Sequence, residues 1–65
     1  MSKRLSMNLR RIREKRGLTQ EALAEKANMH RVYVAQIEAG TKIPSIPALQ
    51  KLAKALKVKV SRLLE

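Results

Sequence analysis

Apolar residues recur along this chain at intervals of three and four, the spacing that places side chains on one face of an α-helix. Leu5, Leu9 and Ile12 show this spacing and predict a first helix from about Ser6 to Arg16. Gly17 follows at the position where a left-handed residue commonly ends a helix. The first helix should therefore stop at this glycine.

Two further short helices are predicted next, separated by a tight connection. Thr19 is a favourable N-cap for a second helix from Gln20 to Ala27, because its hydroxyl can accept a hydrogen bond from a first-turn amide. Asn28 tolerates the left-handed conformation that such a connection requires. A third helix is predicted from Arg31 to about Ala39, and it should end at Gly40.

The last third of the chain predicts two more helices. Ser45 can cap a fourth helix, in which Pro47 lies within the first turn and needs no partner for an amide hydrogen. The apolar side of this fourth helix is predicted to consist of Ile46, Leu49, Leu52, Ala53 and Leu56. A short final helix is predicted from the apolar residues Val58, Val60, Leu63 and Leu64.

No segment shows the strict alternation of apolar and polar residues that is typical of a strand. The predicted fold is therefore all-α, with five short helices around one core. The 65 residues form one domain, residues 1–65, in which residues 1–5 are expected to be a flexible basic arm.

The third predicted helix has an unusual outward side. The side expected to face the core holds Tyr33, Val34 and Ile37. The opposite side holds Arg31, Val32, Ala35, Gln36 and Ala39. A solvated face in a lysine-rich chain should carry Lys and Glu, so this smooth face indicates a contact surface. On the pattern alone, packing against a second subunit and entry into a DNA groove are equally good interpretations.

Composition narrows the classes of function. The net charge of +10 points to a polyanionic partner. There is no Cys, the single His30 has no companion ligands, and the Glu residues are scattered, so neither a metal site nor a catalytic group is predicted. No cofactor or enzymatic activity is expected. The sequence contains no signal peptide or membrane span, and the expected compartment is the cytoplasm.

The segment "LTQEALAEKANMHRVYVAQIEAGTKIPSIPALQKLAKALKVKVSRLL" closely resembles the phage repressor/Cro family of DNA-binding domains, also called the XRE family. The resemblance covers about residues 7–64, and its marks are "GLTQEALA", "YVAQIEAG" and "IPSIPALQKLAKAL". It implies a lambda-repressor-like domain of five helices. The second and third helices would form a helix-turn-helix, with the third lying in the DNA major groove.

The resemblance also implies roles for individual residues. Positions that meet base edges in such repressors are occupied here by Arg31, Val32 and Gln36. Positions that contact DNA phosphates are occupied by Gln20, Tyr33 and Lys42. An ion pair between the first and third helices is implied for Arg13 and Glu38. Dimer contacts are expected at the end of the chain, around Val60, Leu63 and Leu64.

At four positions this chain departs from the family pattern. Asn28 stands where the family usually has Gly, and His30 stands where a Ser or Thr usually caps the recognition helix. His is a poorer cap, so that end is expected to fray or to use a phosphate. Lys57 replaces the Gly that usually ends the fourth helix, and Lys59 replaces a capping Ser or Asp. The last helix and the mode of dimerisation depend on these positions.

The sequence thus predicts a transcriptional regulator, a dimeric repressor that binds a palindromic operator in double-stranded DNA and acts at the nucleoid. One alternative is an antitoxin that binds a toxin protein and also represses its own operon. Another is a nonspecific basic binder of nucleic acid or of membrane surfaces, which would not need the smooth third helix. A further interpretation of the basic residues is a solubilising surface, and it suits Lys51, Lys54 and Lys57 best.

Overall fold

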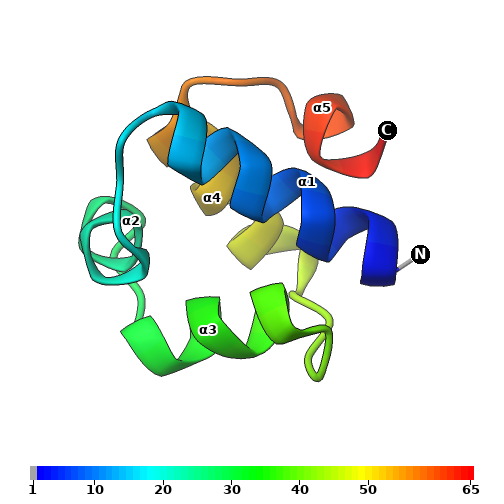
Figure 1. Cartoon of the computed structure of the whole chain (residues 1–65), viewed down its shortest axis with the longest axis horizontal. Helices are drawn as coiled ribbons and strands as arrows, with labels where there is room; N and C mark the ends of the chain where they lie inside the picture. Colours follow the sequence, from blue (N-terminus) through cyan, green and yellow to red (C-terminus); the bar gives the residue numbers. More distant parts are fainter. Residues whose placement is uncertain (1) are drawn as a thin grey trace.

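The computed structural model describes residues 2–65, apart from the side chain of Ser2, and Met1 lies outside the described part. These residues form five helices and no strand, which confirms the all-α prediction. The helices are α1 Ser2–Lys15, α2 Gln20–Lys26, α3 Arg31–Ala39, α4 Ile46–Leu56 and α5 Val60–Leu64. In Figure 1, α1 passes in front of α4, α3 lies below them with α2 at its side, and α5 lies beside α1 near the termini.

All five helices contribute to one apolar core. The largest side chains that are fully buried are Leu9, Leu23, Val34, Ile37, Leu52, Leu56 and Leu63. At least one of them comes from each helix, and most lie at the positions where the helical spacing predicts a buried face. Each such side chain stabilises the fold by about 1.5–3 kcal/mol relative to an exposed one. Packing, rather than helix propensity, therefore holds helices this short in place.

Side-chain caps begin two of the helices where the sequence predicts them. The Thr19 hydroxyl accepts a hydrogen bond from the amide of Ala22 at 3.0 Å, and the Ser45 hydroxyl accepts one from the amide of Ala48 at 3.2 Å. Pro47 lies in the first turn of α4, where it leaves no broken hydrogen bond. These caps fix where α2 and α4 begin.

Left-handed residues end helices at the predicted positions. Gly17, Gly40 and Asn28 have φ angles of 72°, 79° and 56°. Lys57, which ends α4, has a φ of 59°. Asn tolerates this conformation through its short polar side chain, whereas a lysine adopts it at an energetic cost. The chain therefore makes the same turn after α4 that a glycine would make, in a more strained way.

The prediction of a flexible arm over residues 1–5 is wrong for residues 2–5, which form the first turn of α1. Leu5 is only 4% exposed because it packs into the core, and this packing extends the helix toward the N-terminus. Ser6 was expected near the start of the helix. Its hydroxyl instead donates a hydrogen bond to the carbonyl oxygen of Ile37, at 2.7 Å. The part of the prediction that concerns Met1 lies outside the described residues.

Ile46 was predicted on the apolar side of α4, and the structure corrects this. Its side chain is 69% exposed. It occupies the first helical position after the Ser45 cap. The periodic pattern places Ile46 with the buried residues, but the chain enters the helix from the surface at this point.

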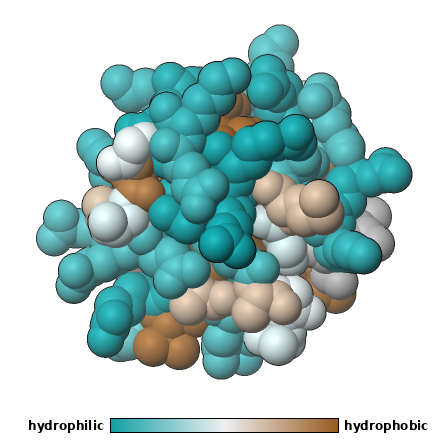
Figure 2. Space-filling view, in the orientation of Figure 1, coloured by the Kyte–Doolittle hydropathy of each residue, from teal (hydrophilic) through white to brown (hydrophobic). Residues whose placement is uncertain are grey.

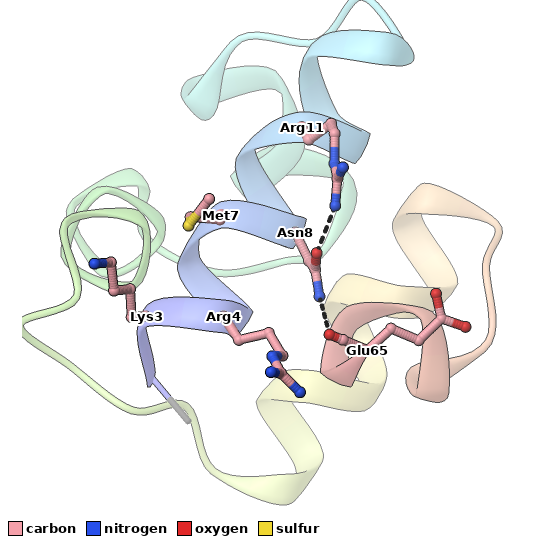
Figure 3. Close-up of a pocket in the computed structure, with 6 residues that line it drawn as sticks. All are labelled: Lys3, Arg4, Met7, Asn8, Arg11 and Glu65. Carbon is pink, nitrogen blue, oxygen red and sulfur yellow. Dashed lines mark hydrogen bonds between the residues drawn. The ribbon is translucent and has the colours of Figure 1, made fainter.

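A buried asparagine attaches α5 to α1 (Figure 3). The side-chain amide of Asn8 donates hydrogen bonds to the carbonyl oxygens of Leu63, at 3.1 Å, and Glu65, at 3.4 Å. The guanidinium of Arg11 in turn donates to the Asn8 side-chain oxygen, at 2.8 Å. At the other end of α5, Lys59 makes no side-chain cap. The last helix is therefore held by its C-terminal end and by the buried Leu63.

Candidate nucleic-acid interface

The residues predicted to read DNA bases lie together on the surface. Arg31 and Val32 are exposed, and Gln36 is half-buried on the same side of α3. They border a shallow surface hollow whose lining consists of Gln20, Glu21, Arg31, Val32, Ala35, Gln36, Ala39 and Thr41. Figure 2 shows pale and brown surface over α3, in the lower part of the view, between hydrophilic groups. The outer face of α3, defined as Arg31, Val32, Ala35, Gln36 and Ala39, is thus open to a partner.

The inward side of α3 is fixed by a charged network. The Arg13 guanidinium donates two hydrogen bonds to the Glu38 carboxylate, from Nε to Oε2 at 2.6 Å and from Nη2 to Oε1 at 3.1 Å. Its Nη1 donates to the carbonyl oxygen of Leu18 at 2.6 Å. Gln20 Nε2 donates to Glu38 Oε1 at 3.0 Å. The predicted ion pair between Arg13 and Glu38 is therefore present. Together with Gln20, it forms a network that joins α1, α2 and α3.

The Arg13–Glu38 ion pair is buried, and its two hydrogen bonds fix a direction. The side chains of Arg13 and Glu38 are 11% and 4% exposed. The hydrogen bond to Glu38 raises the pKa of Arg13 above its usual value, against the opposing effect of burial. The guanidinium therefore keeps its charge throughout the neutral range. Bidentate arginine–carboxylate geometry sets an orientation as well as a distance, so the pair determines how α3 lies on α1.

Tyr33 connects α3 to the start of α4. The side chain is half-buried against the core, and its hydroxyl oxygen accepts a hydrogen bond from the backbone amide of Ser45 at 3.3 Å. Because the hydroxyl acts as an acceptor here, its own hydrogen remains available for another acceptor. Lys42 is exposed in the loop between α3 and α4. Tyr33 lies within α3, whereas Lys42 follows the outer face of α3 in the chain.

His30 caps α3, which corrects the expectation that this end frays or needs a phosphate. Its Nδ1 accepts a hydrogen bond from the amide of Val32 at 3.2 Å. As an acceptor, Nδ1 takes the place of the side-chain oxygen that usually caps a helix. A ring nitrogen can therefore cap a helix in place of the hydroxyl or carboxylate oxygen that the sequence pattern favours. The N-terminal turn of α3, which carries Arg31, is therefore ordered by a local contact.

The three residues predicted as dimer contacts have different environments. Leu63 is 0% exposed because it fills the core of its own chain, so its side chain is not available to a second subunit and that prediction is wrong. Val60 is half-buried against the core, and Leu64 is 41% exposed. The apolar spacing of α5 identified a buried residue here, and the sequence alone does not separate core from interface.

Two residues on the rim of the hollow were missed by sequence reasoning. Glu21 and Thr41 line it together with Gln20 and the outer face of α3. In the sequence, only their positions next to the candidates Gln20 and Lys42 could have indicated Glu21 and Thr41. Glu21 places one carboxylate at the edge of a surface that is otherwise neutral or basic.

The described residues hold no group of three or more His, Asp or Glu side chains arranged to bind a metal ion. Among the same residues, no helix has the length and apolar character needed to cross a membrane.

Two short helices joined by a tight turn, the second with an exposed and nearly neutral face, define a helix-turn-helix domain. The helix-turn-helix family matches residues 9–63, and the chain belongs to this family. The resemblance to phage repressors of the XRE family is thereby confirmed, as is the lambda-repressor-like fold class. The family consists of DNA-binding transcription regulators rather than enzymes.

Curated relatives include repressors and control proteins. The immunity repressor protein of Bacillus phage phi105 is 44% identical over 57 residues, covering 88% of this chain and 40% of the phage protein. Control protein C.BamHI of Bacillus amyloliquefaciens is 40% identical over 58 residues, covering 88% of this chain and 72% of that protein. The chain thus spans less than half of the phage repressor and most of the control protein.

A solved structure agrees in fold over nearly the whole chain. The restriction-modification controller protein C.AhdI of Aeromonas hydrophila superposes with a TM-score of 0.93 at 34% identity. The superposition covers 95% of this chain and 94% of C.AhdI. The five-helix arrangement described above is therefore shared with C.AhdI.

Proposed function

We propose that this chain is a sequence-specific regulator of transcription that binds double-stranded DNA as a dimer and represses its target. The observation that carries the proposal is the outer face of α3, which is exposed, nearly free of charge and bordered by Gln20. Such a face suits a major groove, because small residues such as Ala35 and Ala39 let the helix backbone approach the base edges. A regulator of this kind acts in the cytoplasm, at the nucleoid.

Three side chains on this face have the chemistry for reading bases. Arg31 can donate two hydrogen bonds to guanine, and Gln36 has the donor and acceptor that match adenine. Val32, which is 49% exposed, can pack on a thymine methyl group. One good bidentate contact is worth about 1–3 kcal/mol of discrimination between bases. Two protomers that each place these contacts in a groove would supply operator specificity.

Phosphate contacts would set the register of this helix on the duplex. Gln20 uses one amide hydrogen on Glu38, which leaves the second for a phosphate oxygen. The free hydroxyl hydrogen of Tyr33 and the exposed ammonium of Lys42 are the further candidates. The net charge of +10 adds long-range attraction to any duplex.

Dimerisation follows from the limited reach of one helix. A nine-residue α3 contacts too few base pairs for useful specificity, and a twofold axis doubles the number. The exposed Leu64 and the half-buried Val60 on α5 are the proposed dimer contacts. Half-sites should then lie about 10 base pairs apart, centre to centre.

The regulator is favoured over the antitoxin because the relatives described above are named as a repressor, a control protein and a restriction-modification controller. No observation on this chain favours a toxin as its partner, and the antitoxin is not proposed.

Selection of bound sequences from a pool of random duplexes tests the proposed function. We expect recovery of a palindromic motif whose halves are about 10 base pairs apart. Gln36→Ala should relax the preference at one symmetric pair of positions. Lys42→Ala should instead weaken binding to all sequences alike and make the salt dependence of the dimer shallower by about two units of slope, about one for each protomer. Recovery of random sequences would contradict specific recognition, and a single half-site would contradict the dimer.

A further inference from the structure

A second surface hollow shares no lining residue with the hollow beside the outer face of α3. It has a volume of about 400 Å³ and is lined by Lys26, Ala27, Asn28, Lys51, Lys54 and Ala55. Lys26 comes from the last turn of α2, and the other two lysines come from one side of α4. We call these residues the lysine hollow. It contains three ammonium groups and no carboxylate.

The charges around this hollow are not neutralised within the described part of the chain. Every ion pair among residues 2–65 joins an arginine to Glu14, Glu38 or Glu65, so none involves a lysine of the hollow. The hollow near the termini in Figure 3 is different, since Glu65 lines it and Arg11 donates to Asn8. The lysine hollow is therefore the more strongly positive of the two.

Local helix stability explains only part of this arrangement. Lys26 and Lys54 lie in the last turns of α2 and α4, where a cation interacts favourably with the helix dipole. Lys51 lies in the middle of α4 and gains nothing from the helix end. Because Lys51 and Lys54 are three residues apart, they share one side of the helix and repel each other. A bound polyanion would turn this repulsion into attraction.

The lining indicates which polyanion suits the hollow. Its apolar floor consists only of Ala27 and Ala55, which offers no anchor for a protein side chain. It contains no aromatic residue on which an unpaired base could stack. Lysines bind phosphate oxygens as point charges, without the planar geometry that arginine demands. The lining therefore favours the sugar–phosphate backbone of a duplex.

We propose that the lysine hollow binds the backbone of a second DNA duplex, without sequence preference, while the outer face of α3 holds the first. The protein would thus bridge two DNA segments, which brings a distant site to a bound regulator. This inference rests on the proposed function for the first contact only. The second contact is a property of α2 and α4.

A capture experiment tests the bridge. An immobilised duplex carries the selected site, or a random sequence if selection yields none, and is saturated with the full chain. A fluorescent random duplex of about 30 base pairs is then added at about 50 mM salt. We expect the wild-type protein to capture this second duplex. Lys51→Gln/Lys54→Gln should lower the affinity of capture by about tenfold or more, because two phosphate contacts are lost.

A matched variant separates the hollow from net charge. Lys57→Gln/Lys59→Gln removes the same two charges from exposed residues that do not line the hollow. It should capture the second duplex nearly as well as the wild type. If both double variants lost the same capture affinity, or if neither lost any, the proposal would be overturned.

The remaining outcomes also decide the question. If Lys51→Gln/Lys54→Gln weakens binding to the immobilised duplex itself, these lysines contact the same DNA as α3, and the bridge is wrong. Capture of single-stranded RNA in preference to the duplex would likewise overturn it. The selection could fail to yield a motif while capture of the second duplex still depends on the lysine hollow. That result would contradict the proposed sequence-specific regulator but would support DNA binding by the lysine hollow.

Discussion

The recognition helix α3 and the last helix α5 are both short, yet they are held in different ways. α3 is capped at one end by His30, ends at the left-handed Gly40, and is fixed along its length by Glu38 and Tyr33. α5 has no side-chain cap, and it is held by the buried Leu63 together with hydrogen bonds from α1 to its C-terminal end. The helix with the exposed outer face thus has the more directional attachments.

The difference matches the roles that the proposed function gives to the two helices. Apolar burial is non-directional, so it holds a helix against a core without fixing its rotation tightly. Charge-assisted and bidentate hydrogen bonds fix an angle as well as a distance. A helix that must place Arg31 and Gln36 against particular base edges needs the second kind of attachment. Helix α5 closes the core through Leu63, and apolar burial suffices for that.

The largest expected effect is that of removing the carboxylate beneath α3. Glu38→Ala removes the buried bidentate partner of Arg13 and leaves it only the longer ion pair with Glu14, at 4.0 Å, which should destabilise the fold by about 3–5 kcal/mol in denaturant unfolding. DNA affinity should also fall, because α3 loses its fixed position. Glu65→Ala is the control, since the Glu65 side chain forms an exposed pair with Arg62 and should contribute less than about 1 kcal/mol. If the two variants were equally stable, the buried ion pair under α3 would contribute no more to stability than an exposed ion pair.

A slightly smaller loss is expected at α5. Leu63→Ala removes a side chain that is 0% exposed, and it should cost roughly 2–5 kcal/mol of stability. The protein that remains folded should bind DNA with nearly unchanged sequence preference. Leu64→Ala, at a residue that is 41% exposed, should leave monomer stability within about 0.5 kcal/mol and weaken only dimerisation. If Leu64→Ala lost more stability than Leu63→Ala, Leu64 would be the core residue and Leu63 the candidate for the dimer contact.

The smallest expected change is a gain. Lys59 precedes α5 with extended backbone angles, φ −75° and ψ 150°, but makes no cap. Lys59→Asp should supply an acceptor for a first-turn amide and stabilise the protein by about 1 kcal/mol, visible as a higher unfolding midpoint. Lys59→Ala removes the same positive charge without adding an acceptor, and no gain is expected. If both variants gain equally, charge rather than capping is the cause.

Local signals in the sequence predicted most of the fold. The bounds of α3, the caps Thr19 and Ser45, and the left-handed Gly17 and Asn28 each depend on residues within one or two turns. The start of α1 was placed too late, although Leu5 has the same apolar spacing as Leu9 and Ile12, because the packing that extends the helix is a tertiary contact. The same applies to Asn8, whose partner Leu63 lies 55 residues away in the chain.

The candidate site was predictable to the level of a helix face. The period of α3 separated Val34 and Ile37, which are buried, from the exposed Arg31 and Val32. The role of Gln20 as a link to Glu38 came from the folded arrangement, because the two are 18 residues apart. Tertiary contacts of polar groups leave no periodic trace in a sequence, and the Arg13–Glu38 pair was expected only because the sequence resembles the repressor family.

The central claim is that the outer face of α3 enters the DNA groove, and Ala35→Glu tests it most directly. The measurement is the affinity of this variant for the selected operator, with its unfolding midpoint as a companion. Ala35 lines the open hollow, so stability should change little, while a carboxylate facing phosphates should displace α3. Specific affinity should then fall about hundredfold or more, since the contacts of Arg31 and Gln36 are each worth about 1–3 kcal/mol.

Gln50→Glu makes the same change in charge at an exposed residue of α4, and it should bind the operator nearly as well as the wild type. The account predicts a folded Ala35→Glu protein that no longer distinguishes its operator from random DNA. A folded Ala35→Glu protein that still binds the operator with wild-type affinity would show that α3 is not the element that reads DNA.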